Sequence, residues 1–561
     1  QAFILRAVCE HDERHRAGES GAEQFLVCGT AGSGKTYLIR AIKHKLGDRC
    51  LLLAPTGVAA DNIGGRTYQQ YLPVPSRGDL NRPTIRPTGK RLKQLRLDWK
   101  GVTHCILDEM SMLGRRCLGQ IDELLRAATN REDPFGGINL ILVGDHGQLP
   151  PVKDKHMYDW SGVRYVDPAK RGQYLATAPL WERRGIEAYD RIIRRGFTFF
   201  LDRIERARDY AFQQLQLRAR DGELTPTDAE YLRKHMDLSK RGADFFGPDV
   251  YRLVPTRRER DEFNAEQLDR AIDEGKPSIV LEAVNSSNLA AEADEDQIKL
   301  FNTLILTIGA RVMILHNLCV AHGLVNGTTG FVHDVICDSK GKPISVLLLL
   351  KRRTATSDGY SGPSFVSQAD GVNMETHAIV AIGLYRAEIY HGDGCHMRTQ
   401  FPLGLAWVVT IHKAQGLTLP RVIFNAGQVE RETGSFFTAL TRVRELAHMA
   451  FDPVPDEMRL TEEIAKKPAM YLRKVHDWEL RLRARETAHR LAHLAPPPSA
   501  LGPVPPRPTK YMPPKTKTAA VARASDGRRQ STLSHTLERQ SSQMQAAAHV
   551  CPAKRAHPQS K

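Results

Sequence analysis

A glycine-rich turn between an apolar run and an amphipathic helix constrains this chain more than any other feature. The turn lies in "VCGTAGSGKTYLIR", residues 27–40, directly after the strand-like run "QFLVC" at 24–28. A helical apolar face follows, marked by Leu38, Ile39, Ile42 and Leu46. Backbone N–H groups of such a turn, placed at a helix start, close around phosphate oxygens. The order strand, turn and helix therefore predicts a phosphate-binding α/β fold.

Residues 29–36 spell G-T-A-G-S-G-K-T, a complete Walker A pattern. We expect nucleotide contacts from Gly29, Thr30, Ala31, Gly32, Ser33, Gly34, Lys35 and Thr36. Lys35 is placed to neutralise charge on the β- and γ-phosphates, and Thr36 is placed to ligate Mg²⁺. The alternative is a structural glycine turn. The turn alone also leaves kinases, GTPases, motors and transporters open.

Three further apolar runs end in polar turns, as the first one does. They are "CLLLAPTG" at 50–57, "THCILDE" at 103–109 and "INLILVGD" at 138–145. Short apolar runs that alternate with helical segments indicate a parallel sheet covered on both faces. Ligands of such sheets bind at the carboxyl ends of the strands, where the polar residues of these runs fall.

Two of these strand ends carry candidate catalytic residues. Asp108 and Glu109 follow a buried run, so Asp108 is expected to hold Mg²⁺ and Glu109 to polarise the attacking water. The alternative is that the acidic pair only caps the next helix. In "LVGDHGQLPPV" at 142–152, Gln148 is placed to reach a γ-phosphate from the neighbouring strand. A base at Glu109 implies transfer to water, hence an NTPase and not a small-molecule kinase.

A second α/β unit is expected from about residue 200 onward. Its strand-like runs are "VYRLVPT" at 250–256, "GARVMIL" at 309–315 and "AWVVTIHKAQG" at 406–416. Between 318 and 400 the pattern changes to short strands with turns, which predicts a small β-barrel insertion. Residues 71–99 are rich in Pro, Arg and Lys and read as an insertion in the first unit.

The charge of the chain favours a polyanionic partner. Lys and Arg number 80 against 64 Asp and Glu, a net charge of +16, and residues 494–561 carry +9 of it. A soluble protein with a cationic tail is the alternative.

The nine cysteines form no C-x-x-C pair, so we expect neither a disulfide framework nor a zinc site. This cysteine usage is typical of a protein in a reducing compartment. The sequence contains no run of about 18 apolar residues, so we expect no membrane-spanning helix.

The motifs, taken in order, resemble those of the petite integration frequency (PIF) DNA helicases of superfamily 1, relatives of the RecD helicases. "APTGVAA" with "GGRT" resembles the family's first DNA-contacting motif, "LDEMSML" its Walker B and "GDHGQLPPV" its nucleotide sensor. "GARVMILHNL" with "LVNGTTGFV" resembles the entry to its small β-barrel. "VVTIHKAQGLTL" is highly specific to the family.

The resemblance also implies site residues. "LDRIERARDYAF" places Arg206, and "FTALTRVR" places Arg442, as arginines directed at the γ-phosphate. Gln1 corresponds in distance to a glutamine that reads adenine, so the chain is expected to begin within that motif, and Gln415 is a further expected nucleotide contact. Expected DNA contacts are Thr56, Thr67, His412 and Thr418. The chain departs from the family at "TYQQY" after Thr67, where a His is usual, and at Ala207, where a Gln is usual.

The implied fold is α/β, with two RecA-like P-loop domains, a wedge insertion, a small β-barrel insertion and a disordered basic C-terminal tail. The expected boundaries are 1–195 for the first domain with its insertion at 71–99, 196–317 and 401–455 for the second, 318–400 for the barrel, 456–494 for a basic helical extension and 495–561 for the tail.

The implied function is an ATP- and Mg²⁺-dependent DNA helicase that moves 5′ to 3′ on single-stranded DNA and unwinds forked duplex. Expected roles are DNA repair, recombination, replication or telomere maintenance, inside the cell, in the nucleus or mitochondrion of a eukaryote and otherwise in the cytoplasm. Three alternatives stay open: a translocase without strand separation, a DNA-binding ATPase, and the helicase portion of a mobile-element protein. No membrane partner is expected, and the oligomeric state stays open, with a monomer compatible.

Overall fold

A computed structural model describes residues 1–494 and residue 508, apart from 73, 75–86, 160–174, 208, 248, 294, 355–358, 392–393 and 466–467. Apart from residue 508, the predicted tail at 495–561 lies outside the described residues, as does most of the segment before residue 87 in the predicted insertion at 71–99. Within the described ranges, no helix has the length and apolar composition needed to cross a bilayer.

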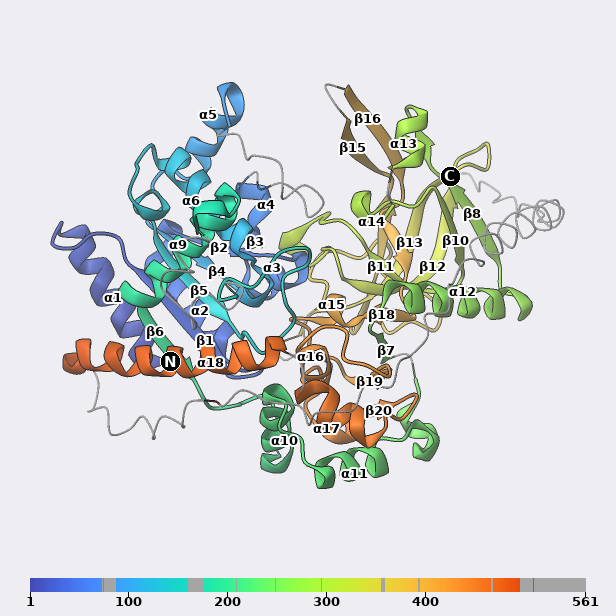
Figure 1. Cartoon of the computed structure of the whole chain (residues 1–561). Coiled ribbons are helices and arrows are strands. Elements are labelled where there is room, and N and C mark those ends of the chain that lie inside the picture. The colour runs from blue at the N-terminus through green and yellow to red at the C-terminus, as the bar shows by residue number, and fades with distance from the viewer. Residues whose placement is uncertain are drawn as a thin grey trace. The chain divides into compact units, whose positions relative to one another are not determined.

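Six parallel strands form the first sheet (Figure 1). Its strands, in spatial order, are β3 (Arg66–Thr67), β2 (Cys50–Ala54), β4 (His104–Leu107), β5 (Asn139–Gly144), β1 (Gln24–Gly29) and β6 (Phe197–Leu201). Successive residues of β1 enter different cores, since Leu26 packs into one apolar cluster and Phe25 and Val27 into another. Both faces of the sheet are therefore buried, as the continuous apolar runs predict.

Helices cover the two faces of this sheet. One core contains buried residues of α1 (Ala2–Arg16), α2 (Lys35–Leu46) and α3 (Gly57–Ile63). The other contains residues of α5 (Gly89–Asp98), α6 (Arg115–Thr129) and α9 (Leu180–Arg195). The short helix α4 (Tyr68–Tyr71) follows β3, so α4 and α5 flank the undescribed part of the predicted insertion.

A second parallel sheet has four strands. They are, in spatial order, β18 (Val408–Thr410), β7 (Val250–Val254), β19 (Arg421–Phe424) and β20 (Met449–Phe451). The helices of this region are α10 (Tyr210–Asp221), α11 (Pro226–His235), α12 (Arg257–Asp273), α15 (Ile411–Ala414), α16 (Ser435–Leu440) and α17 (Glu457–Ala465). The helix α18 (Pro468–Arg490) follows them and packs along β6 of the first sheet. Two parallel sheets with packed helices confirm the predicted α/β fold with two RecA-like domains.

Antiparallel strands lie between β7 and β18 in the chain. Five form one sheet: β14 (His377–Gly383), β13 (Pro343–Lys351), β12 (Thr329–Cys337), β11 (Arg311–Ile314) and β17 (Leu403–Leu405). Two smaller sheets pair β10 (Thr303–Thr307) with β8 (Ser278–Glu282), and β15 (Tyr385–His391) with β16 (Gly394–Gln400) and β9 (Val284–Asn285). The helices α13 (Asn288–Glu292) and α14 (Glu295–Ile298) complete this region.

The structure corrects two sequence-based assignments. The run at 309–315 does not enter the second parallel sheet, because β11 pairs antiparallel with β12 and β17, so the antiparallel region extends beyond the predicted 318–400. Residues 197–201 do not belong to the second domain, because β6 pairs parallel with β1. An apolar run indicates a buried strand, but it does not identify the sheet to which the strand belongs.

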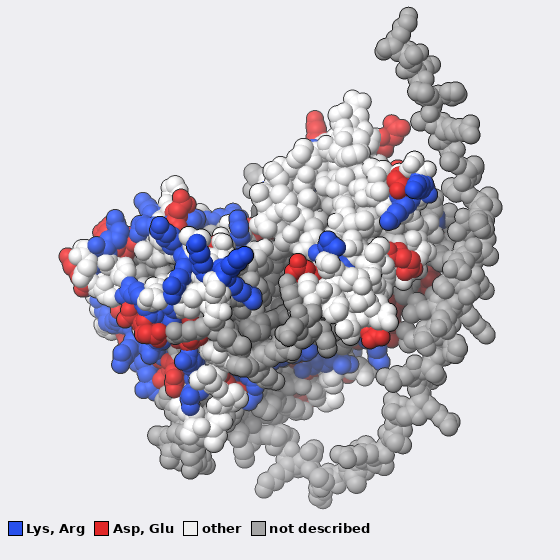
Figure 2. Space-filling model, turned by 90° about the horizontal axis from the view of Figure 1, so that it is seen from above, with Lys and Arg blue, Asp and Glu red and all other residues white. Residues whose placement is uncertain are grey.

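Charge is unevenly distributed on the face seen in Figure 2. Lys and Arg gather there over the first RecA-like domain, whereas the surface over the antiparallel strands is mostly neither basic nor acidic. In α5, Lys90, Arg91 and Lys93 are exposed. The basic excess of the chain is thus displayed at least partly on a folded domain.

Candidate nucleotide-binding site

A cavity of about 410 Å³ lies at the carboxyl ends of the first sheet's strands. Its wall combines the glycine-rich turn, the end of β4, the loop after β5 and residues of the second RecA-like domain. The lining residues are Ala31, Gly32, Gly34, Lys35, Thr36, Ala59, Asn62, Asp108, Glu109, Gln148, Glu205, Arg206, Gly416, Arg442 and Arg444. All five predicted catalytic residues therefore face one cavity, although they are up to 407 positions apart in the sequence.

The glycine-rich turn has a backbone that only glycine adopts easily. Gly32 and Gly34 have φ values of 80° and 84°, in the left-handed region. A Cβ on Gly32 would lie 2.4 Å from Cβ of Arg206, so this glycine also allows the second domain to approach. Nζ of Lys35 donates hydrogen bonds to the carbonyls of Gly29 and Thr30, at 2.8 and 2.9 Å.

Asp108 and Glu109 form a buried acidic pair at the end of β4. Burial, together with the charge of Glu109, raises the pKa of Asp108 well above its usual range. Oδ1 of Asp108 is buried, with no hydrogen-bond partner in the described part of the chain. Glu109 has a φ of 52°, a strained backbone for a non-glycine residue and one of the kind that clusters at active sites.

The oxygen atoms of Asp108 and Thr36 suit a hard cation such as Mg²⁺. Asp108 and Thr36 both line the cavity and offer a carboxylate and a hydroxyl, which are ligand types that Mg²⁺ accepts together with phosphate oxygens. No group of three or more His, Cys, Asp or Glu side chains suited to a metal occurs among the described residues. A cation at this site would thus depend on the nucleotide for further ligands.

The predicted sensor, Gln148, is buried in the loop after β5 and lines the cavity. Its Oε1 atom accepts no hydrogen bond within the described residues, so it is available to a donor such as a water molecule. Three residues earlier, Asp145 is paired with Arg220 of α10 at 2.7 Å. Burial alone would raise the pKa of Asp145, but the Arg220 guanidinium outweighs burial and lowers it.

Two arginines reach the cavity from the polypeptide beyond β6. Arg206 donates to the carbonyl of Thr441 at 3.1 Å, and its backbone N–H donates to the carbonyl of Gly32 at 3.2 Å. Arg442 is 1 % exposed and pairs with no carboxylate among the described residues. Burial and the neighbouring Arg206 lower the pKa of Arg442 to about 9. Both side chains are thus cations close to the glycine-rich turn.

Several other predicted nucleotide contacts lie beside the cavity and do not line it. Gly29, Thr30 and Ser33 are in the turn but outside the lining set. Gln1 is exposed, and its Nε2 lies 3.3 Å from the carbonyls of Ser33 and Gly34. Gln415 is buried and donates to Oε2 of Glu109 and to Oγ of Ser111, both at 3.2 Å. In this structure Gln415 therefore contacts the predicted general base.

The four predicted DNA contacts divide into two groups by position. Thr56 caps α3, because its Oγ1 accepts from the N–H of Ala59, and Thr67 precedes α4. His412 and Thr418 come from the second domain. Nε2 of His412 lies 2.8 Å from Oε2 of Glu432, and Thr418 is exposed. The structure brings the two groups together only through their neighbours in α3 and the segment 411–418.

Contacts between α3 and the polypeptide beyond residue 300 link the two domains beside the cavity. Nδ2 of Asn62 donates to the carbonyl of Gly416 at 3.1 Å. Arg353 pairs with Asp61 at 3.0 Å. A Cβ on Gly327 would lie 2.2 Å from a methyl group of Val58, so the Asn-Gly turn of the antiparallel region packs closely on α3. The helix that begins at Thr56 is therefore a junction between domains.

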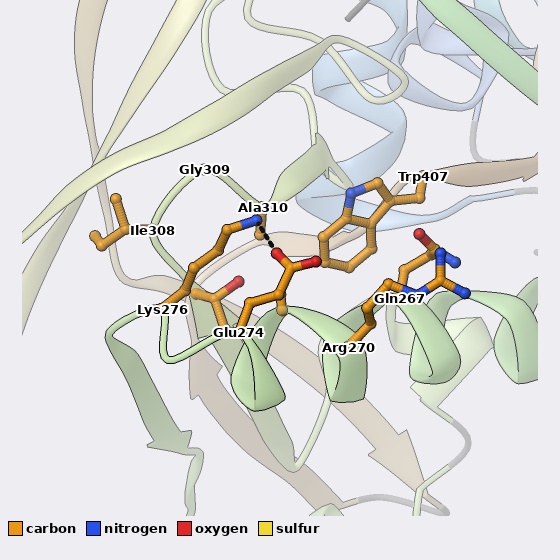
Figure 3. Close-up of a pocket in the computed structure, with 10 residues that line it drawn as sticks. Gln267, Arg270, Glu274, Lys276, Ile308, Gly309, Ala310 and Trp407 are labelled. Atoms are coloured by element: carbon orange, nitrogen blue, oxygen red, sulfur yellow. Dashed lines mark ion pairs between the residues drawn. The ribbon is translucent and has the colours of Figure 1, made fainter. Parts of the chain in front are cut away.

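Two aromatic residues border the DNA-contacting motifs, Tyr68 after Thr67 and Trp407 before Val408. Tyr68 is buried in the core of the first domain. Trp407 is half-buried and lies beside Gln267 and Arg270 of α12, where Lys276 and Glu274 form an ion pair at 2.9 Å (Figure 3). This hollow of about 90 Å³ is separate from the larger cavity and shares no lining residue with it.

Sequence reasoning missed Asn62, Glu205 and Arg444 of the cavity wall and the partner of Asp145. Asn62 lies six residues after Thr56, and Arg444 lies two residues after Arg442, so both are close to motifs that were recognised. Arg220 lies in a helix with no recognised motif, and no local signal identifies it.

Comparison with known proteins agrees with this geometry. The model of the PIF1-like helicase family matches residues 3–166, and that of the DNA helicase Pif1 2B domain matches residues 301–335. The ATP-dependent DNA helicase Pif1 of Bdellovibrio bacteriovorus is 30 % identical over 427 residues, which are 76 % of this chain and 83 % of that protein. The chain belongs to the PIF1-like helicase family.

Other members of the family are similar over a comparable part of this chain. PIF1 of Xenopus laevis is 28 % identical over 77 % of this chain, and human PIF1 is 27 % identical over 81 %. The chain spans about 60 % of the length of these two relatives. Among solved structures, Pif1 of Candida albicans has a TM-score of 0.57 and 25 % identity, covering 80 % of this chain and 93 % of that one. The Bacteroides Pif1 complex with ADP-AlF3 and ssDNA has a TM-score of 0.57 and 23 % identity over the same shares.

Proposed function

We propose that this chain is an ATP-dependent DNA helicase that moves along single-stranded DNA and separates forked duplex. The observation that carries the proposal is the composition of one cavity. It joins the Walker A and Walker B residues of the first domain to Arg442 of the second. Membership of the family supplies the nature of the substrate, because Pif1 of Bdellovibrio bacteriovorus is an ATP-dependent DNA helicase.

The residues take their roles from their positions in this cavity. Lys35 and the turn at 29–36 hold the phosphates of ATP, while Thr36 and Asp108 ligate Mg²⁺. Glu109 orients and polarises the attacking water, and Gln148 contacts the γ-phosphate. Gln1 reads the adenine, since its side chain lies against the end of the turn.

Coupling to movement follows from the origin of the two arginines. Arg206 and Arg442 stabilise charge on the transferred phosphoryl group only when the second domain is close to the first. Hydrolysis and phosphate release remove the anion that both cations and Lys35 share. The domains then separate, and two domains that each hold a strand advance along it by alternate closing and opening.

The DNA path runs over the junction between the domains. Thr56 and Thr67 belong to the α3 side, and His412 and Thr418 belong to the segment that contacts α3 through Gly416. Small polar groups at strand ends suit contacts to the sugar–phosphate backbone, which do not depend on base sequence. The 5′ to 3′ polarity, the wedge role of 71–99 and roles in repair, recombination, replication or telomere maintenance rest on the family resemblance, as does an intracellular location.

The second candidate is a translocase that moves on single strands without separating duplex. The same cavity serves both activities, because each requires ATP hydrolysis coupled to domain closure. The exposed basic residues Lys90, Arg91 and Lys93 of α5 favour the helicase, since they lie within the predicted wedge and offer cations to duplex phosphates.

The decisive experiment measures ATP hydrolysis with and without single-stranded DNA, for the wild type and Glu109→Gln. Strong stimulation by DNA, lost in the variant, supports a coupled motor. Unwinding of duplexes with a 5′ tail, a 3′ tail or no tail then separates the helicase from the translocase and sets the polarity. Hydrolysis that is indifferent to DNA refutes the helicase proposal.

A further inference from the structure

The sensor loop after β5 is fixed by an arginine from outside all the recognised motifs. Oδ1 of Asp145 accepts a hydrogen bond from the backbone N–H of Gly147 at 2.9 Å. The same oxygen accepts from Nε and Nη2 of Arg220, at 3.0 and 2.7 Å. A Cβ on Gly147 would lie 2.6 Å from Nε of Arg220, so the arginine side chain packs directly on the backbone of the residue before Gln148.

The loop also contacts the N-terminus of α16. A Cβ on Gly434 would lie 2.5 Å from the carbonyl oxygen of Gly147 and 2.8 Å from that of Gln148. The sensor loop is therefore enclosed between Arg220 and the helix whose following turn carries Arg442. Both walls therefore restrict the loop, together with the hydrogen bond of 2.8 Å between Nε2 of His146 and the hydroxyl of Tyr189.

Arg220 is itself held by the C-terminal helix α18. Its Nη1 donates to Oδ2 of Asp477 at 2.8 Å and to Oδ1 of Asp221 at 3.0 Å. Arg473, one turn before Asp477, donates to the same Oδ2 at 3.1 Å and to the backbone carbonyl of Arg220 at 2.7 Å. Three carboxylates and two guanidinium groups thus form one network, which begins at the partly exposed Asp221 and ends at the buried Asp145 of the sensor loop.

The helix α18 is anchored to both RecA-like domains. Met470 belongs to the core of the second domain, whereas Leu480, and Leu491 directly after the helix, belong to the two cores of the first. Oγ1 of Thr487 accepts from the N–H of Thr198 in β6 at 2.9 Å, which covers the edge of the first sheet. Asp477 is therefore held in place by packing on either side of it.

We propose that Arg220 and Asp477 are positioning residues of the ATPase, which hold the sensor loop so that Gln148 faces the γ-phosphate. The inference rests on the proposed ATPase function and extends its machinery to α18, beyond the last recognised motif. The geometry requires an arginine at 220, because Nε and Nη2 reach one carboxylate while Nη1 reaches two others. A lysine ammonium offers donors from one point only.

The test compares Arg220→Gln, Arg220→Lys and Asp477→Asn with the wild type. Lys474→Ala is the matched control, because Lys474 of α18 pairs with Glu223 and its link to the network is only its charge, which helps to lower the pKa of Asp221. For each variant, kcat and KM for ATP are measured at saturating single-stranded DNA, and the fraction of active molecules is determined by titration with a fluorescent ADP. Rates are then expressed per active site.

Displacement of a catalytic contact by about 1 Å lowers rates by about a hundredfold, so we expect a kcat loss of that order for Arg220→Gln. KM is expected to change far less, because the turn and Lys35 still bind the phosphates. Arg220→Lys and Asp477→Asn should fall between this variant and the wild type, and Lys474→Ala should match the wild type. Asp477→Asn keeps the size of the side chain, so it remains measurable if Arg220→Gln does not fold.

A double variant separates positioning from simple charge balance. Arg220→Gln combined with Asp145→Asn removes the unpaired buried carboxylate, and this should restore thermal stability but not kcat. Recovery of wild-type kcat in the double variant would overturn the inference, as would an unchanged kcat per active site in both Arg220→Gln and Asp477→Asn. A wild type without DNA-stimulated hydrolysis would instead refute the proposed function.

Discussion

Replacing Arg442 by alanine is the perturbation whose effects the structure separates best. The guanidinium of Arg442 has five N–H groups, and the described residues engage four of them. The acceptors are the carbonyls of Thr438, Ala414 and Leu417 and Oγ1 of Thr441, at 2.7–3.3 Å. One N–H of Nη2 is left for a phosphate oxygen, so a single side chain serves both the fold and the proposed reaction.

The cost to the fold is moderate, because two of the four acceptors keep another donor. The carbonyl of Ala414 still accepts from the N–H of Leu417, and that of Thr438 still accepts from Oγ1 of Thr441. The carbonyl of Leu417 loses its donor, at a cost of about 1–3 kcal/mol. Loss of an arginine finger lowers turnover by about a thousandfold or more, which corresponds to about 4 kcal/mol of barrier.

The two effects are measured separately. Thermal unfolding of the nucleotide-free protein reports the stability cost, and single-turnover hydrolysis at saturating ATP and DNA reports the barrier. Arg442→Lys is the control, because it retains a positive charge but cannot span the same carbonyls. We expect it to recover only part of the rate. A folded Arg442→Ala variant that turns over ATP at the wild-type rate would remove this residue from the site and refute the argument.

Three further predictions concern the turn and the acidic pair. Lys35→Ala should abolish hydrolysis and leave binding of single-stranded DNA largely intact, as measured by fluorescence anisotropy; normal turnover would refute the phosphate site. Because the pKa of Asp108 is raised in the fold, this group contributes stability at low pH that is lost as pH rises through the raised pKa. Asp108→Asn should therefore melt higher than the nucleotide-free wild type at pH 8, with a smaller difference at pH 5, while hydrolysis is lost. An equal difference at both pH values would contradict the assigned cause. Gly32→Ala should lower both melting temperature and kcat, since φ is 80° and the new methyl group meets Arg206; an unaltered kcat would show that this contact is unimportant.

Local sequence patterns were sufficient to predict those site residues that directly follow a strand-like run. The turn at 29–36, the pair Asp108–Glu109 and Gln148 each follow an apolar run, and parallel strands end at one edge of a sheet. Their convergence on one cavity could therefore be predicted. Arg206 and Arg442 were found only through resemblance, because an isolated arginine on a basic chain carries no distinguishing pattern.

Long-range pairing is what the sequence could not supply. The four residues of β11 read like any buried strand, and only their partners in β12 and β17 place them in the antiparallel region. The same holds for Arg220, whose two acidic partners outside its own helix are 75 and 257 positions away. Such pairs depend on the tertiary fold, since nothing in the flanking residues selects one arginine over another.

The segment 411–418 contains two of the four predicted DNA contacts. It also contains residues that contact the ATP cavity directly. Gln415 donates to Glu109, and the carbonyl of Gly416 accepts from Asn62, within a few residues of His412 and Thr418. Any factor by which ATP changes the affinity for DNA must equal the factor by which DNA changes the affinity for ATP. A substitution at Gln415 that reduces one of these factors must therefore reduce the other equally. Two independent titrations of the same variant would then yield a single coupling energy.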